Sequence, residues 1–118
     1  MNCFDHEKLD VYKVSIEFIG FSAGVYESFP KGKGFLADQF QRAATSIVLN
    51  IAEGAGEFSK KDKGRFYRIA RRSATECAAI LDVCFQLQLV EPDQMQAVRK
   101  LLLRVVAMLT QMAKRCSH

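Results

Sequence analysis

The stretch from Asp38 to Gly54 constrains the fold more than any other part of the chain. It predicts a helix whose only charged residues are Asp38, Arg42 and Glu53. Its apolar residues recur at helical spacing and share one face, formed by Phe40, Ala43, Ala44, Ile47 and Ile51. A helix on a solvated surface normally carries more charge. The pattern therefore predicts a helix inside a bundle, with alanines that let neighbouring helices come close.

A polar line runs along the same helix. Its members recur at gaps of three and four residues, which places them on one face: Gln39, Arg42, Ser46, Asn50 and Glu53. Arg42 and Glu53 are too far apart along the helix to pair with each other, so both need partners on neighbouring helices, and Glu76 is the candidate for Arg42. We predict a buried polar network that fixes the register of the bundle, formed by Arg42, Ser46, Asn50, Glu53 and Glu76.

Amphipathic segments with short connections lie on both sides of this helix. Asp5 is a candidate cap for a first helix, and Phe29-Pro30 ends it. Gly54 is a candidate left-handed cap for the central helix. Ser59 is placed to cap the next helix, and Pro92 suits the first turn of the last one. The predicted helices cover residues 6–29, 35–53, 60–89 and 92–114.

The two C-terminal segments each carry an apolar seam at alternating gaps of three and four residues, the spacing of packed helices. In the long helix the seam is Phe66, Ala70, Ser73, Cys77, Ile80, Cys84 and Leu87. In the last helix it is Met95, Val98, Leu102, Val105, Leu109 and Met112. Four such helices and no strand pattern predict one all-α domain over residues 1–118, an antiparallel up-down four-helix bundle.

The first helix has two apolar lines. One consists of Leu9, Tyr12, Ile16, Ile19, Ala23 and Tyr26, and the other of Val11, Val14, Phe18, Phe21 and Val25. A helix that is apolar over more than half its circumference needs two surfaces to pack against. Its own bundle is the first surface. Another subunit is the candidate for the second, so the pattern favours a homo-oligomer.

The sequence contains few residues in patterns typical of catalytic or metal-binding sites. The two histidines, His6 and His118, lie near the termini, and no serine or cysteine has a histidine partner by spacing. There is no C-x-x-C pair, and Gly32-Lys33-Gly34 lacks the spacing of a phosphate-binding loop. Cys116-Ser117-His118 is interpreted as a frayed tail rather than a metal site. We expect a protein that is not an enzyme and has neither cofactor nor metal.

The same features bear on the compartment. No run of 18 apolar residues occurs, so no membrane span is expected. The first residues include Asp5, Glu7 and Asp10 instead of a signal-peptide pattern, so we do not expect export. The four cysteines are interpreted as reduced and mostly buried, which is typical of a cytoplasmic protein.

Positive charge is concentrated at the start of the long helix. Residues 31–75 contain ten cations and four carboxylates, while the whole chain has a net charge of +4. The candidate nucleic-acid-binding residues are Lys60, Lys61, Lys63, Arg65, Arg68, Arg71 and Arg72, with Phe66 and Tyr67 between them. Lys61, Arg65, Arg68 and Arg72 form one stripe at gaps of four, three and four, which could neutralise phosphates without reading sequence. The alternative interpretation is a solvated face with internal ion pairs.

Several of these stretches together resemble a known family. They are Leu9 to Lys13, Phe29-Pro30, Gln39 to Ile47, Asn50 to Gly54, and Arg65 to Arg71 with Ser73, Ala74 and Glu76. This set is similar to the bacterial four helix bundle proteins encoded in intervening sequences of large-subunit ribosomal RNA genes. The chain departs from the family pattern at Gln41 and Glu57, which replace common basic residues, and at Arg72, which replaces a small one.

The resemblance implies a four-helix bundle that assembles as a homopentamer. Five copies at +4 each would carry +20 together, a strongly cationic particle. The family is also similar to pentameric accessory proteins of diversity-generating retroelements, which bind nucleic acid and a reverse transcriptase. RNA, DNA and a reverse transcriptase or other protein are therefore the partners that the resemblance implies, besides further copies of the chain.

The leading hypothesis is a non-enzymatic, cytoplasmic, homo-oligomeric accessory protein that binds RNA or DNA through the residues from Lys60 to Arg72. The alternative from another class is an oligomeric protein-interaction scaffold without a nucleic-acid ligand. A metal-dependent or hydrolytic enzyme is the third hypothesis. Loss of binding at high salt would favour the first over the second.

Overall fold

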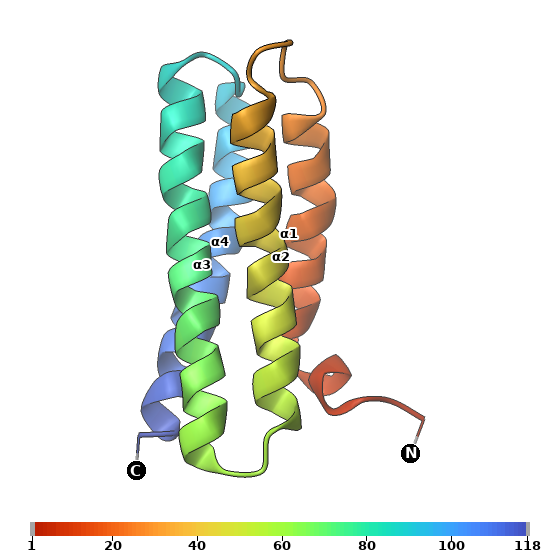
Figure 1. The fold of residues 1–118 in the computed structure, drawn as a ribbon, viewed down its shortest axis with the longest axis vertical. Helices are drawn as coiled ribbons and strands as arrows, with labels where there is room; N and C mark the ends of the chain where they lie inside the picture. The colour runs from red at the N-terminus through yellow and green to blue at the C-terminus, as the bar shows by residue number, and fades with distance from the viewer. Residues whose placement is uncertain (1, 118) are drawn as a thin grey trace.

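Four long helices joined by short turns make up the structure, a computed structural model that describes residues 2–117 (Figure 1). α1 spans Asp10–Tyr26, α2 Gly34–Gly56, α3 Lys60–Gln86 and α4 Pro92–Arg115, and a short 3-10 helix, η1 (Asp5–Lys8), precedes α1. No strand occurs in this part of the chain. The predicted all-α class is confirmed.

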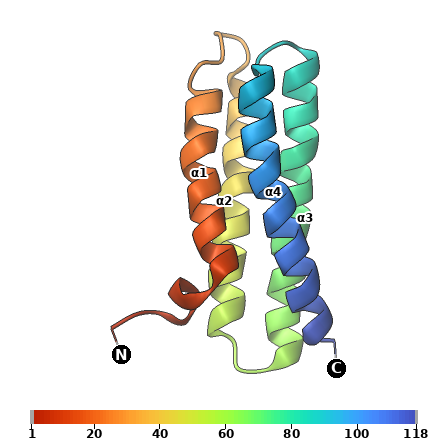
Figure 2. The same cartoon turned by 180° about the vertical axis from the view of Figure 1, so that it is seen from behind.

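Consecutive helices run in opposite directions and pack around a square. α2 lies beside α1 and α3, and α4 lies beside α3 and α1, while the backbones of the two diagonal pairs lie farther apart. The α1–α2 and α3–α4 turns lie at one end of the bundle, and the α2–α3 turn lies at the other (Figures 1 and 2). Both ends of the described residues lie on the side of the α2–α3 turn. This arrangement is the antiparallel four-helix bundle that the sequence predicts.

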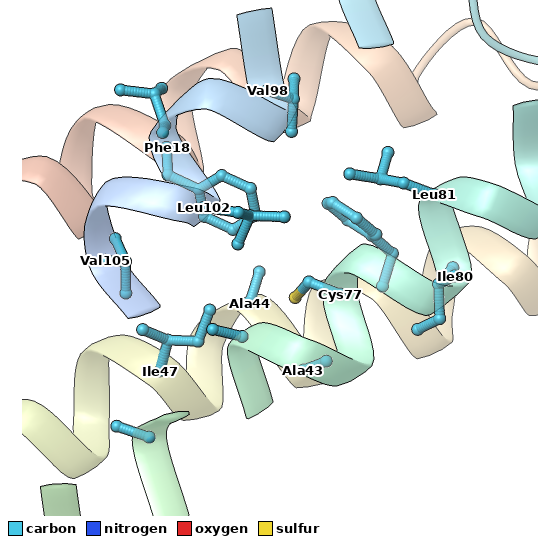
Figure 3. Packing of buried hydrophobic residues seen from close by; sticks show 14 of the residues in the cluster. Phe18, Ala43, Ala44, Ile47, Cys77, Ile80, Leu81, Val98, Leu102 and Val105 are labelled. Atoms are coloured by element: carbon cyan, nitrogen blue, oxygen red, sulfur yellow. The ribbon is translucent and has the colours of Figure 1, made fainter. Parts of the chain in front are cut away.

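The core lies along the axis between the four helices (Figure 3). The predicted apolar face of α2 is fully inside it, with Ile47 and Ile51 both 0% exposed. Most of the predicted α4 seam is equally buried, namely Val98, Leu102, Val105 and Leu109. From α1 the line that contains Phe18 faces the core, except for Phe21, which is 51% exposed. The other α1 line is only half-buried, apart from exposed Ile16.

The predicted α3 seam is correct in its middle and wrong at both ends. Ala70, Cys77 and Cys84 are buried, but Phe66 is half-buried and Leu87 is 46% exposed. At the start of α3 the buried aromatic residue is Tyr67 instead of Phe66. An α-helix has 3.6 residues per turn, so a seam extrapolated at gaps of three and four drifts off the core over its length. Leu87 also lies beyond the last residue of α3.

The first helix is shorter than predicted. Leu9 has an extended backbone, with φ −84° and ψ 129°, and separates η1 from α1. Asp5 therefore begins the 3-10 helix and does not cap α1. The imidazole of His6 packs edge-on against the ring of Tyr12 at 4.6 Å between centroids, which holds η1 beside the first turn of α1. α1 ends at Tyr26, before Phe29-Pro30, where proline disfavours helical backbone in the preceding residue.

α3 ends three residues earlier than predicted, in a compact C-cap. The backbone N–H of Leu89 donates to the carbonyl of Cys84 at 2.9 Å, and that of Gln88 donates to Phe85 at 3.0 Å. This pair of bonds defines a Schellman motif. Gln88 occupies the left-handed position with φ +60°, where glycine is usual. Because the motif lacked glycine, the sequence did not mark this helix end.

The prediction that Gly54 caps α2 was wrong, because the helix continues to Gly56. The role of Gly54 is to admit a neighbouring side chain. A Cβ placed on Gly54 would lie 2.7 Å from Cε1 and 2.9 Å from Cδ1 of Tyr67. Only a residue without a side chain lets α2 and the start of α3 approach this closely.

Burial governs the chemistry of the cysteines, which are all free in residues 2–117. Cys77 and Cys84 are buried, as the sequence predicts, whereas Cys3 is exposed and Cys116 is half-buried. Burial, with a smaller contribution from Glu76, raises the pKa of the Cys77 thiol to about 12. The two core cysteines therefore act as small apolar side chains at neutral pH. None of the described helices is long and apolar enough to span a bilayer.

Candidate nucleic-acid interface

The seven predicted cations lie on the first three to four turns of α3. Six of them are exposed and Lys63 is half-buried. The N-terminus of α3 is capped by Ser59. The N–H of Asp62 donates to Oγ of Ser59 at 3.1 Å, and the Ser59 hydroxyl donates to the Asp62 carboxylate at 2.9 Å. The predicted cap at Ser59 is confirmed.

Lys63 is engaged inside the fold. Its Nζ donates to the carbonyl of Ala55 at 3.0 Å and to that of Gly54 at 3.3 Å. These carbonyls belong to the last turn of α2, where the helix dipole is negative. Lys63 thus satisfies the end of α2 and ties it to the start of α3. This cation is a structural group, so we remove it from the predicted binding set.

Arg71 also serves the bundle. Its Nε donates to Oγ1 of Thr110 on α4 at 2.7 Å, and the Thr110 hydroxyl donates in turn to the carbonyl of Val106 at 2.7 Å. The guanidinium is therefore held across the α3–α4 contact, although the side chain is exposed. It flanks the predicted stripe instead of belonging to it.

The remaining cations form what we call the α3 basic face, consisting of Lys60, Lys61, Arg65, Arg68 and Arg72. The guanidinium of Arg65 stacks over the ring of Phe66, with Cζ 4.6 Å from the ring centroid. The guanidinium of Arg68 lies over Gly64, where an added Cβ would approach Nη1 to 3.1 Å. Within residues 2–117 no cation of this face forms an ion pair with a carboxylate. The internal ion pairs of the alternative interpretation are absent there.

The position of this charge is electrostatically unfavourable for the helix itself. The N-terminal end of a helix carries partial positive charge and favours anions. In the first turn of α3 only Asp62 is acidic, whereas Lys60 and Lys61 add positive charge. Cations and helix dipole together produce a local positive potential that can hold an anionic ligand.

The aromatic residues near this face differ from the predicted ones. Tyr67 is only 5% exposed, and burial, with a smaller contribution from Cys116, raises its pKa. Phe66 is half-buried beneath Arg65. Tyr67 is thus enclosed in the fold, and one face of the Phe66 ring is covered by Arg65. Phe58, in the α2–α3 turn, is fully exposed. Its only signal in the sequence is its place two residues before Lys60.

The predicted polar network is only partly present. The hydroxyls of Ser46 and Ser73 share a hydrogen bond of 2.8 Å between α2 and α3, and Nδ2 of Asn50 donates to Oγ of Ser46 at 3.0 Å. Ser73, which the helical spacing places in the apolar seam of α3, is thus also a member of this network.

The charged members of the network are exposed. Arg42, Glu53 and Glu76 make no hydrogen bond or ion pair within residues 2–117, so the prediction that they are buried was wrong for these three. All three side chains are exposed to solvent. The part of the network that joins α2 to α3 is the hydrogen bond between Ser46 and Ser73.

Other candidate sites offer less chemistry. In the described residues no three His, Cys, Asp or Glu side chains are grouped to hold a metal ion, and His118 lies outside these residues. A hollow of about 600 Å³ lies between the start of α1 and the end of α4, lined by Leu9, Asp10, Val11, Ala107, Met108, Gln111, Met112 and Arg115. Its ionisable groups are Asp10 and Arg115, and it contains no nucleophile or histidine.

The fold defines a small protein built as an antiparallel bundle of four helices. Comparison with protein families assigns residues 7–111 to the 23S rRNA-intervening sequence proteins. The chain belongs to this family, which is the one that its motifs resemble.

A solved structure shows the same fold. It is the crystal structure of a protein with unknown function from the S23 ribosomal protein family of Bacteroides thetaiotaomicron VPI-5482. The two superpose with a TM-score of 0.81 at 22% sequence identity, over 88% of this chain and 98% of the other. No curated protein matches the sequence.

Proposed function

We propose that this chain is a non-enzymatic, homo-oligomeric accessory protein that binds RNA or DNA electrostatically through the α3 basic face. The observation that carries the proposal is the set of five exposed cations of that face, which have no carboxylate partner in the described chain. Unpaired surface cations can neutralise phosphates at no cost in broken ion pairs. The name of the family, which refers to an intervening sequence of 23S rRNA, is consistent with a nucleic-acid setting.

The placement of the cations supports a binding role over mere solubility. Solubility requires charge anywhere on the surface, whereas here charge gathers at the helix end where it opposes the dipole. Features that break a local rule without a structural gain are typical of functional sites. Lys63 shows the contrast, because its charge is used by the end of α2.

Charge reversal tests this face. The triple variant Lys61→Glu, Arg65→Glu, Arg68→Glu is expected to bind an RNA or DNA oligonucleotide on the order of 100-fold more weakly at low salt. Its plot of log affinity against log salt should be shallower by about 2, since each lost contact with a single strand removes ~0.7. Fluorescence anisotropy at several salt concentrations measures both quantities.

The matched control is Arg99→Glu, Lys100→Glu, Arg104→Glu, which reverses two arginines and one lysine, all exposed, on α4. It changes net charge equally and is expected to keep most of the affinity. Equal losses in both variants would assign binding to net charge and not to α3. A wild-type protein that binds neither RNA nor DNA at low salt would contradict the proposal and favour the scaffold alternative.

The proposed oligomer is supported by apolar side chains that a single chain leaves in water. Ile16 and Phe21 on α1 are 46% and 51% exposed, and Leu49 on α2 is 58% exposed. A partner subunit would cover such residues. From the family resemblance we expect a pentamer, so light scattering at micromolar concentration should give the mass of five chains of 13.3 kDa each. A monomer mass under these conditions would contradict the oligomer.

A further inference from the structure

Phe58 stands apart from every other large apolar side chain of the described protein. Its exposed fraction is 102%, so its ring touches nothing in the fold. It occupies the α2–α3 turn at the end of the bundle where the α3 basic face begins (Figure 1). Lys60 and Lys61, both exposed, follow it directly after the cap residue Ser59.

The turn around Phe58 is held firmly although the ring itself is free. On one side the N–H of Glu57 donates to the carbonyl of Gly54 at 3.2 Å, and Lys63 reaches back to the same carbonyl. On the other side Ser59 caps α3. Anchors on both sides fix the backbone that carries the ring. Phe58 is therefore presented at a defined place, next to cations, without contributing to the core.

The chemistry of this tip suits an unpaired base better than a protein or a membrane. One ring is far smaller than the ~800 Å² that each partner buries in a stable protein interface. Interfacial membrane binding needs a helix with a broad apolar face, which the start of α3 lacks. A nucleic-acid base needs only one aromatic face for stacking, with cations nearby for its phosphates.

We propose that Phe58 is a stacking platform for an unpaired base, so that the ligand is single-stranded RNA or DNA. The strand would place one base on Phe58 and its phosphates along Lys60, Lys61, Arg65 and Arg68. This inference rests on the proposed function and narrows its ligand. A duplex keeps its bases stacked on each other, so it would gain from the cations but not from Phe58.

Tryptophan at position 58 reports stacking directly. The chain contains no tryptophan, so Phe58→Trp creates a single tryptophan, whose emission can be excited selectively in the presence of the three tyrosines. Its emission is expected to be quenched by a single-stranded oligonucleotide such as oligo(dT) or oligo(U), and little changed by duplex DNA. The matched control is Phe35→Trp, a 60% exposed position at the opposite end of α2, which should stay unquenched.

Affinity gives a second, independent readout. Phe58→Ala is expected to weaken single-strand binding by about 5- to 150-fold, while Phe58→Tyr keeps it. The salt slope and the affinity for duplex should not change, because no cation is removed. The ring contacts nothing, so these variants should fold as the wild type does.

The outcomes separate the two proposals. If the wild-type protein binds nucleic acid with the expected salt dependence but Phe58→Ala binds equally well, stacking is wrong and the basic face stands. If neither RNA nor DNA binds at all, the proposed function fails as well. A Phe58→Trp emission that shifts with anionic lipid vesicles but not with oligonucleotide would overturn stacking in favour of a lipid surface.

Discussion

Replacing Tyr67 by alanine is expected to lower the free energy of unfolding by about 3–5 kcal/mol, the range for truncating a large buried aromatic residue. The ring is 5% exposed and fills the space beside Gly54 at the α2–α3 contact. Denaturant unfolding followed by far-ultraviolet circular dichroism measures the change. This would be among the largest effects of any single substitution in the chain.

Tyr67→Phe is the matched control. It keeps the ring and removes a hydroxyl for which the structure shows no hydrogen bond. We expect it to change stability by less than about 1 kcal/mol. If Tyr67→Ala were as stable as wild type, the ring could not be part of the core. Tyr67 would then return to the set of candidate ligand contacts among the α3 cations.

Gly54→Ala is expected to destabilise the fold by about 1–3 kcal/mol, although alanine is the better helix former by up to ~1 kcal/mol. The new methyl group would meet Cε1 of Tyr67 at 2.7 Å, inside van der Waals contact, and either the ring or α2 would have to move. The steric term therefore outweighs the gain in helix propensity. The same unfolding experiment measures it.

Gly20→Ala provides the comparison. Gly20 lies within α1, and a Cβ there has no neighbour within 4 Å. This substitution should stabilise the chain by about 0.5–1 kcal/mol. Stabilisation by both substitutions would show that α2 and α3 do not approach closely at Gly54. The double variant Gly54→Ala, Tyr67→Ala should lose less than the sum of its parts, because the methyl group then enters the space that the ring left.

The helices could be predicted because their signals are local. The α4 seam through Val98, Leu102 and Val105 is continuous in sequence, and its period alone places these residues in the core. The cap at Ser59 likewise needs only residues that follow it within one turn. The role of Gly54 could not be predicted in this way. Its partner, Tyr67, becomes a neighbour only after the chain has turned back on itself.

In the candidate site, too, local features could be predicted from the sequence and contacts between helices could not. Helical spacing correctly placed Lys61, Arg65 and Arg68 on an outer face. It could not show that Lys63 bonds to carbonyls of α2 or that Arg71 reaches Thr110, because both contacts depend on how the helices pack.

The prediction that the whole polar line on α2 is buried was wrong for a related reason. A helical wheel gives the direction of a side chain but not its depth. Ser46 lies in the contact with α3 because it is short, whereas Arg42 extends past the contact into water.

The two ends of residues 2–117 lie on the same side of the bundle as the α2–α3 turn (Figures 1 and 2). This geometry affects how the protein should be handled. An affinity tag, a fluorescent fusion or a surface tether at either terminus would stand at the same end of the bundle as the α2–α3 turn and could shield that end. The turn at Pro30–Lys33, at the far end of the molecule, is the better place for a label or an immobilising group, and binding data from the two attachments should be compared.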